Sequence, residues 1–181
     1  MKLMFASDIH GSLYYAEKTI GAYKNEKADK LILLGDLLYH GPRNDLPKDY
    51  NPKGVIALLN SVKNEILAVR GNCEAEVDQM VLEFPVMAEY CILFEKGRMW
   101  FITHGHRFNV SNPPMLKKGD LLIHGHTHIQ AVEEQPEGYV YINPGSVSIP
   151  KNGNKNSYMI YEEGKFYIKD LDGNIIKEYG L

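Results

Sequence analysis

The residues of this chain best suited to metal chemistry are six of its seven histidines, which fall into three short clusters. The clusters are Asp8-Ile9-His10, His104-Gly105-His106 and His124-Gly125-His126-Thr127-His128. Between them, Gly35-Asp36 and Gly71-Asn72 add a carboxylate and an amide oxygen. Neutral imidazole combined with carboxylate and amide oxygen suits divalent ions of borderline to hard character, and this many such groups exceed the needs of one ion. The pattern therefore predicts two adjacent metal ions.

Several of these polar residues follow short apolar runs that we expect to be strands. Asp8 follows Lys2–Ala6, Asp36 follows Lys30–Leu34, Asn72 follows Ile66–Val69, and His104 follows Met99–Thr103. Open α/β sheets bind ligands beyond the carboxyl ends of their strands, so these side chains should converge on one crevice. Residues two apart in an extended segment, as in Asp8 and His10 or His126 and His128, project to the same side.

The rest of the chain predicts an α/β fold that would bring these strand ends together. Amphipathic segments around Leu13–Lys24 and Lys53–Val62 have helical spacing and alternate with the first three strands. The second half indicates strands without long helices, at Tyr90–Glu95, Met99–Thr103, Leu121–His124, Gln130–Glu133, Tyr139–Ile142, Tyr158–Tyr161 and Lys165–Leu171. We expect the two halves to form two facing sheets within a single domain spanning residues 1–181.

Composition narrows the range of partners and compartments. With 181 residues, 44% of them hydrophobic, and a net charge of -3, the chain can build one core and has no general attraction for nucleic acid or anionic membranes. The apolar runs are strand-sized, and the N-terminal stretch reaches Asp8 and His10 before a signal-peptide pattern develops. Cys73 and Cys91 are too few for a disulfide scaffold. These features predict a cytoplasmic protein that does not bind membranes, and a homo-oligomer is a reasonable expectation for a small enzyme.

Other polar residues have ordinary structural explanations as well as functional ones. An isolated Asp-x-His after a strand most often caps the following helix. His124 lies one step out of register with His126 and His128, so we interpret it as a strand residue satisfied by a local hydrogen bond. Asn143-Pro144-Gly145-Ser146 is interpreted as a turn between strands. The segment His40–Pro52 predicts an ordered loop over the site, in which Arg43 either binds a substrate phosphate or remains a solvated charge.

Taken in order, the motifs resemble those of the calcineurin-like metallophosphoesterase superfamily. They are Asp8-x-His10, Gly35-Asp36, Gly71-Asn72-Cys73-Glu74, His104-Gly105-His106 and Gly125-His126-Thr127-His128. Two further segments are similar in sequence to bacterial YfcE-type phosphodiesterases. They are His40-Gly41-Pro42-Arg43-Asn44 and Asn143-Pro144-Gly145-Ser146-Val147-Ser148-Ile149-Pro150. The resemblance spans most of the chain and implies a four-layer α/β/β/α fold, in which two facing sheets form a sandwich flanked by helices.

The resemblance also implies a role for each motif residue. Asp8, His10 and His128 would hold one ion, Asn72, His104 and His126 the other, and Asp36 would bridge them. A hydroxide shared by the ions would attack the phosphorus of a small phosphodiester substrate, and His106 and Arg43 would stabilise the developing charge. The family points to manganese, although the ligand types also admit nickel, cobalt, zinc and iron.

Cys73 departs from the superfamily pattern, in which a histidine follows the asparagine of this motif and protonates the leaving group. A thiol, with an ordinary pKa of roughly 8.5, is a poorer proton donor at neutral pH than an imidazolium of roughly 6.5. We therefore expect either a preference for diesters with acidic leaving groups or a share of the acid role for His106.

Two other functions stay open on the sequence. A phosphomonoesterase or nucleotide phosphatase would use the same residues. A non-catalytic scaffold like the small subunit of retromer would share the fold with a partly lost ligand set, whereas all seven ligand positions are filled here. Strong nucleic-acid binding is not expected, because the chain is slightly acidic and has no basic patch.

Overall fold

The computed structural model describes all 181 residues and contains two sheets. The first sheet has six strands in the order β11-β10-β9-β1-β2-β3. Its strands are β1 (Lys2–Ala6), β2 (Lys30–Leu33), β3 (Ile66–Ala68), β9 (Ser157–Glu162), β10 (Lys165–Asp170) and β11 (Ile175–Gly180). The strands β1, β2 and β3 pair in parallel, and β9 joins them antiparallel to β1. The carboxyl ends of β1, β2 and β3 therefore lie at one edge of this sheet.

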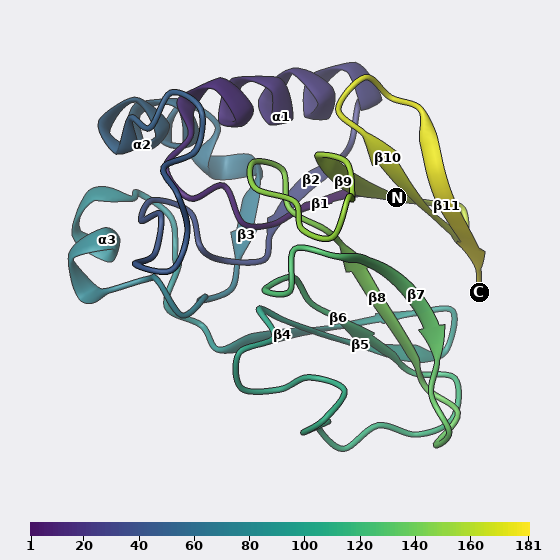
Figure 1. The fold of residues 1–181 in the computed structure, drawn as a ribbon. Helices are drawn as coiled ribbons and strands as arrows, with labels where there is room; N and C mark the ends of the chain where they lie inside the picture. The colour runs from purple at the N-terminus through teal and green to yellow at the C-terminus, as the bar shows by residue number, and fades with distance from the viewer.

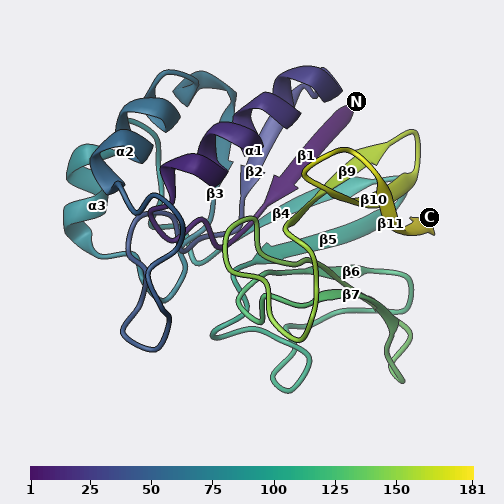
Figure 2. The same cartoon turned by 45° about the horizontal axis from the view of Figure 1, so that its top comes forward.

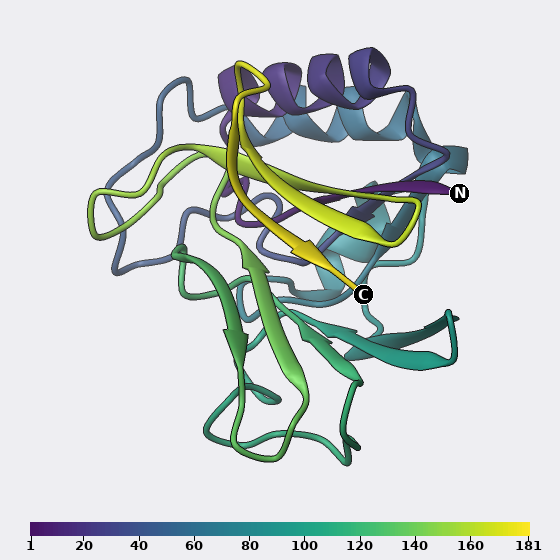
Figure 3. The same ribbon diagram turned by 90° about the vertical axis from the view of Figure 1, so that its right-hand side faces the viewer.

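The second sheet has five strands in the order β4-β5-β6-β8-β7. Its strands are β4 (Tyr90–Glu95), β5 (Arg98–Thr103), β6 (Leu121–Ile123), β7 (Gln130–Glu134) and β8 (Val140–Pro144). The central strands β5, β6 and β8 are parallel, and β4 and β7 pair antiparallel at the two edges. Figure 3 shows this sheet lying below the first one, with the teal β4–β5 hairpin at its margin.

The helices lie on the first sheet. Helices α1 (Leu13–Glu26) and α2 (Pro52–Asn60) run across its outer face, and a short helix, α3 (Glu76–Val81), lies to one side (Figure 1). A single 3₁₀ turn, Lys63–Glu65, leads into β3. Ser12 caps α1 by accepting a hydrogen bond from the backbone N–H of Tyr15, which supplies a partner for one of the free N–H groups of the first turn.

Two apolar layers hold the structure together, and alternate residues of β1 contribute to each. Met4 and Ala6 pack toward the helices, in a cluster of 21 buried residues. Leu3 and Phe5 pack toward the second sheet, in a cluster of 15 that includes Trp100. A strand buried on both faces needs a continuous apolar run, which explains why Lys2–Ala6 does not alternate with polar residues.

The predicted α/β class, with two facing sheets flanked by helices, is confirmed. The layer outside the second sheet is formed by the loop between β5 and β6, which packs Phe108 and Leu116 onto Phe101, Leu122 and Tyr139. The division into halves was wrong, because β9, β10 and β11 return to the first sheet beside β1. The helix α3 and the strand β11 were not predicted. None of the helices is long and apolar enough to cross a membrane.

Candidate metal centre

The seven predicted ligand residues come together in the structure, although they are far apart in the sequence. Asp8 and His10 follow β1, Asp36 follows β2, Asn72 follows β3, His104 follows β5, and His126 and His128 follow β6. Three overlapping groups of side chains have potential ligand atoms within 4.8 Å of one another. They are Asp8 with His10 and His128, Asp36 with His104 and His126, and His10 with Asp36 and Cys73. The third group links the first two, because it contains His10 of the first and Asp36 of the second.

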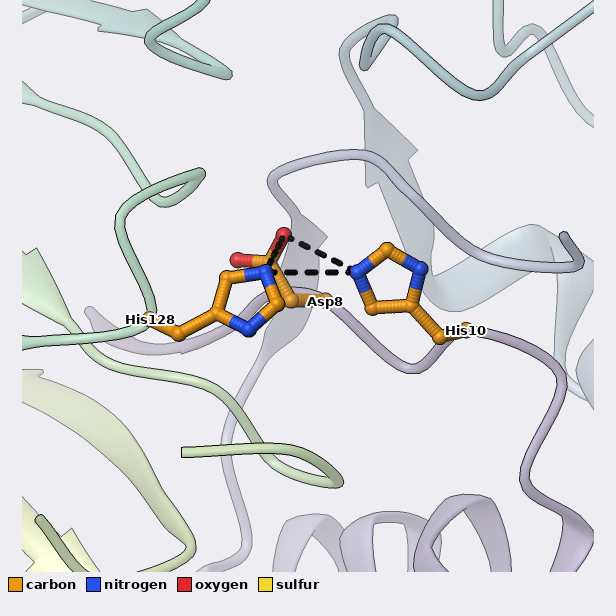
Figure 4. Close-up of side chains that lie close together, drawn as sticks. All are labelled: Asp8, His10 and His128. Atoms are coloured by element: carbon orange, nitrogen blue, oxygen red, sulfur yellow. Dashed lines mark hydrogen bonds and ion pairs between the residues drawn. The ribbon is translucent and has the colours of Figure 1, made fainter. Parts of the chain in front are cut away.

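In the first group, acceptor atoms face one another (Figure 4). The Nε2 atoms of His10 and His128 are 3.3 Å apart, and they lie 3.6 and 3.2 Å from Oδ1 of Asp8. Each Nδ1 lies 2.8 Å from a backbone carbonyl, that of Tyr39 for His10 and that of Ile149 for His128. A carbonyl only accepts, so each Nδ1 carries the proton and each Nε2 presents a lone pair. The buried Oδ1 of Asp8 has no hydrogen-bond partner. Converging lone pairs of this kind fit a cation.

The second group repeats this arrangement. The Nδ1 of His104 lies 2.6 Å from the carbonyl of Leu34, so in the neutral ring, the form that binds a metal ion, its Nε2 is an acceptor. That Nε2 lies 3.1 Å from Oδ1 of Asn72, 3.2 Å from Nδ1 of His126 and 3.4 Å from Oδ2 of Asp36. The same Oδ2 lies 3.7 Å from Nε2 of His10 in the first group. One carboxylate therefore contacts both groups, and the donor set fits two neighbouring divalent ions.

Charge in this buried site favours cations. Burial alone would raise the pKa of Asp8, but its contacts with His10 and His128 and the charge of His104 hold it well below its usual value. Burial alone would lower the pKa of His104, but the Asp36 hydrogen bond and the charges of Asp8 and Asp36 raise it to about 9. His126 differs, since burial and the charge of His104 lower its pKa to about 4. A field that stabilises an imidazolium at His104 also stabilises a metal cation.

The backbone at these residues is in a conformation that side chains seldom adopt. Five of the seven have positive φ angles, namely Asp8, His10, Asp36, His126 and His128, with values from 50° to 65°. For residues other than glycine this left-handed region is uncommon, and it clusters at functional sites where the surrounding structure imposes it. The turns that aim these side chains inward must therefore be held by other parts of the protein.

One such support comes from the segment that we interpreted as a turn between strands. Ser146 and Ser148, which follow β8, both donate hydrogen bonds of 2.8 Å from Oγ to the backbone carbonyl of Asp8. Ser7 donates a further bond of 2.6 Å to Oδ2 of Asp8. The Asn143–Ser148 stretch is thus more than a turn, because it fixes the backbone of a candidate ligand. No spacing of residue types in the sequence indicates this role.

A second support, also missed, is the buried carboxylate of Glu74. It accepts hydrogen bonds from the backbone N–H groups of Gly71, Asp36 and Leu37, at 2.5, 2.9 and 2.7 Å. A side chain at position 71 would collide with Oδ1 of Asp36. Glu74 and the glycine together hold the turns after β2 and β3 against each other, with Asn72 beside them.

Cys73 lies in the cleft next to the ligands. Its backbone N–H donates to Oδ1 of Asp36 at 2.9 Å, and its Sγ accepts from the side-chain amide of Asn72 at 3.3 Å. Burial and the charge of Asp36 raise the pKa of the thiol. Cys73 therefore stays protonated beside the ligand cluster.

The predicted loop is present beside the site. Arg43 and Asn44 of this loop line a cleft of about 60 Å³ together with Cys73, His126, His128 and Lys151. Figure 2 shows the blue loop and the lime segment that carries Lys151 side by side. The loop is tied to the turn after β1: Asn51 N–H donates to the carbonyl of Gly11, Leu13 N–H to that of Asp49, and Ser12 Oγ to that of Lys48, at 2.8, 2.9 and 2.5 Å.

The remaining predicted histidines lie at the margin of the cluster. The ring of His106 is 5.5 Å from that of His104 and 6.4 Å from that of His126, and its buried Nδ1 has no hydrogen-bond partner. His124 stacks on Tyr141, and its Nδ1 lies 3.0 Å from the carbonyl of Gly125, which is the local hydrogen bond that we predicted. Burial lowers the pKa of His124 to about 4, so it is neutral.

Comparison with known proteins agrees with this geometry. Residues 1–165 match the calcineurin-like phosphoesterase superfamily domain. The curated Phosphodiesterase YfcE of Escherichia coli (strain K12) is 52% identical over 183 residues, covering 100% of this chain and 98% of that protein. A solved structure of YfcE, a phosphoesterase from E. coli, has a TM-score of 0.95 at 45% identity, with 99% of each chain covered. The zinc complex of wild-type Vps29 from Entamoeba histolytica has a TM-score of 0.60 at 16% identity, with 99% of each chain covered, which shows the fold alone.

Proposed function

The chain belongs to the calcineurin-like phosphoesterase superfamily and is a phosphodiesterase of that family, and from this premise we propose that the cluster around Asp36 is its active site. The contact of one Asp36 oxygen with both histidine groups carries this proposal, at 3.4 Å from His104 and 3.7 Å from His10. The proposed substrate is a small phosphodiester, and the adjoining cleft, which Arg43 and Lys151 line, is where it would bind.

Each group would hold one divalent ion. Asp8, His10 and His128 would bind the first through one carboxylate oxygen and two Nε2 atoms. The ligands of the second would be Asn72 and His104, with His126 binding through Nδ1. Asp36 would bridge the two. Manganese is the first expectation, and nickel, cobalt, zinc and iron suit the same donors. The zinc complex of Vps29 supports a divalent ion in this fold.

When bound, the ion pair supplies a shared hydroxide nucleophile and Lewis acidity toward the phosphoryl oxygens. The residues of the chain have separate tasks. Arg43 and Lys151 place two positive charges at the cleft, which favours binding of an anionic diester. His106, beside the second group, is proposed to stabilise charge on the phosphoryl oxygens or to share in protonating the leaving group. The Cys73 thiol, which lies close to His10 and Asp36 where a histidine is usual, is proposed as the other proton donor to the leaving group.

The experiment compares two substrates on one protein. The metal-free chain is loaded with manganese and assayed on bis(p-nitrophenyl) phosphate and p-nitrophenyl phosphate. We expect the diester to be preferred, and a preference for the monoester would favour the phosphatase alternative. Asp36→Asn should lower the rate by at least a hundredfold and reduce the bound metal from two ions per chain. Asp172→Asn, whose aspartate side chain is 80% exposed and does not line the cleft, serves as the matched control. A chain that binds no manganese, nickel or zinc would support a scaffold and refute the proposal.

A further inference from the structure

The outer face of the second sheet carries a row of exposed apolar side chains on its edge strand β4. Tyr90, Ile92 and Phe94 are 46%, 42% and 74% exposed, and alternate residues of β4 face the core between the sheets. Next to Phe94 lies an apolar hollow of about 570 Å³ that is lined also by Met99 and Met115. The lining side chain of Met115 is 96% exposed. Contiguous apolar surface of this kind on a folded chain commonly marks an interaction site.

The backbone of β4 is open along the same edge. The strand pairs only with β5, with an unbroken register from Tyr90 to Glu95, and no hydrogen bond outside that ladder reaches the backbone of these residues. One side of the strand therefore presents unpaired N–H and C=O groups. Such an edge can accept another strand, so proteins usually protect it with charge, proline, a bulge or short length.

The other three sheet edges of this molecule are protected in those ways. The edge strand β3 has three residues. On β11, charged Lys177 and Glu178 occupy the middle of the strand, and its pairing with β10 shifts register. The edge strand β7 ends in Glu133 and Glu134. Only β4 has six residues, no register shift and an apolar run of five, with its single charge at Glu95.

We infer that β4 pairs with β4 of a second copy of this chain, antiparallel about a two-fold axis at Ile92, to form a continuous ten-stranded sheet. The sequence of the strand is self-complementary in this register: Tyr90 lies opposite Phe94 of the second copy, Cys91 opposite Leu93, and Ile92 opposite Ile92. Every residue from Tyr90 to Phe94 then faces an apolar residue. Cross-strand pairs of aromatic and β-branched residues stabilise a sheet. A two-fold contact uses the same patch on both copies.

Neighbouring registers match less well. Two-fold pairing must keep side chains on matching faces, so the next possible axes lie at Cys91 and Leu93. With the axis at Cys91, Leu93 would face Glu89 of the second copy. With the axis at Leu93, Cys91 would face Glu95. The Ile92 register thus avoids placing a carboxylate opposite an apolar residue of the run. It sets Glu95 opposite Glu89 of the second copy, at the two ends of the run, where the Glu89 carboxylate is ion-paired with Arg107.

The first experiment measures the mass of the full chain in solution by sedimentation at micromolar concentration. We expect a dimer for the wild type and a monomer for Ile92→Lys, because two ammonium groups would meet at the axis. Ile175→Lys is the matched control, since Ile175 is also an exposed isoleucine, 57% exposed, on an edge strand. It should remain a dimer. A monomeric wild type, or a dimer that survives Ile92→Lys, would overturn the inference.

The second experiment tests the register and does not depend on a charged variant. Directly opposed Cα atoms in an antiparallel pair are about 4.5 or 5.5 Å apart, within the roughly 4.4–6.8 Å that a disulfide spans. Under mild oxidation, Ile92→Cys should give a cross-linked dimer on a non-reducing gel, whereas Ile175→Cys and the wild type should not. Cross-linking of the wild type through Cys91 would place the axis at Cys91 and overturn the proposed register. Equal cross-linking of both variants would overturn the contact itself.

Discussion

Replacing Ser146 with alanine would remove a hydroxyl that makes three hydrogen bonds beside the candidate metal centre. Its Oγ donates to the carbonyl of Asp8 at 2.8 Å and accepts from the backbone N–H groups of Ser148 and Ile149, at 3.2 and 2.9 Å. The Ser148 hydroxyl donates a single bond, also to the Asp8 carbonyl. Both serines are buried, at 0% and 6% exposure. The two alanine variants therefore form a matched pair with different numbers of lost bonds.

The size of the difference follows from the bond count. A buried hydrogen bond contributes on the order of 1 kcal/mol to the free energy of unfolding. Ser148→Ala should cost about 1 kcal/mol, because Asp8 keeps its bond from Ser146. Ser146→Ala should cost about 3 kcal/mol, because it also leaves two backbone donors without a partner. The Asp8 backbone, at φ 59°, would lose part of what holds it in place, so manganese affinity should fall by about tenfold for each 1.4 kcal/mol lost at the site.

The assay is urea unfolding with a chelator present, so that bound metal does not contribute to the measured free energy. Manganese titration by calorimetry then measures the affinity of the folded variants. If Ser146→Ala were no more costly than Ser148→Ala, or if both bound manganese like the wild type, the proposed support of Asp8 would be refuted.

Three further outcomes can be checked separately. Gly125→Ala should lower both the unfolding temperature and the affinity for manganese. The added methyl group would lie 2.7 Å from Cβ of buried Ser7 and 2.8 Å from Oδ2 of Asp8. Unchanged thermal unfolding and an unchanged metal titration would contradict this prediction. Cys73→His should reduce the difference in rate between aryl and alkyl diesters, since an imidazole can protonate a poor leaving group, and an unchanged ratio of the two rates would remove the proton-donor argument. The Glu26 carboxylate is partly buried, which would raise its pKa, but its contacts with Lys169, Lys2 and Tyr158 lower the pKa overall. Its contribution to stability is therefore complete above its unfolded pKa of about 4.3 and is lost as the pH falls through the lower folded value. The unfolding free energies of wild type and Glu26→Gln, measured with chelator, should differ most near neutral pH and converge in acid; a constant difference would refute the assignment.

The ligand cluster could be predicted from the sequence because most of its residues directly follow an apolar strand. Asp8, Asp36 and Asn72 follow β1, β2 and β3, and parallel neighbours necessarily bring those ends together. The choice of sheet for later strands depends on long-range pairing. The apolar run of β9 would suit either sheet, and only its register against β1 places it in the first. Periodicity could not supply that information.

The supports of the site escaped prediction for a different reason. Glu74 and Ser146 act through backbone groups of distant residues, and such bonds leave no pattern of side-chain types or spacing. The strand β11 escaped because its charged middle residues break the alternation that marks a half-buried strand. The left-handed backbone at His10 and His126 is likewise unmarked in the sequence, since glycine is the usual residue for such angles.

The bonds that tie the loop over the cleft to Gly11, Ser12 and Leu13 have a consequence for how substrates are selected. A loop that opens and closes with each turnover must break the hydrogen bonds that hold it. Here those bonds are made to the turn that carries His10. Moving Lys48, Asp49 and Asn51 outward would disturb the turn that carries His10, a proposed metal ligand. We therefore expect this end of the loop to stay in place during turnover, so that discrimination between diesters rests on the shape and charge of the cleft rather than on closure of the whole loop after binding.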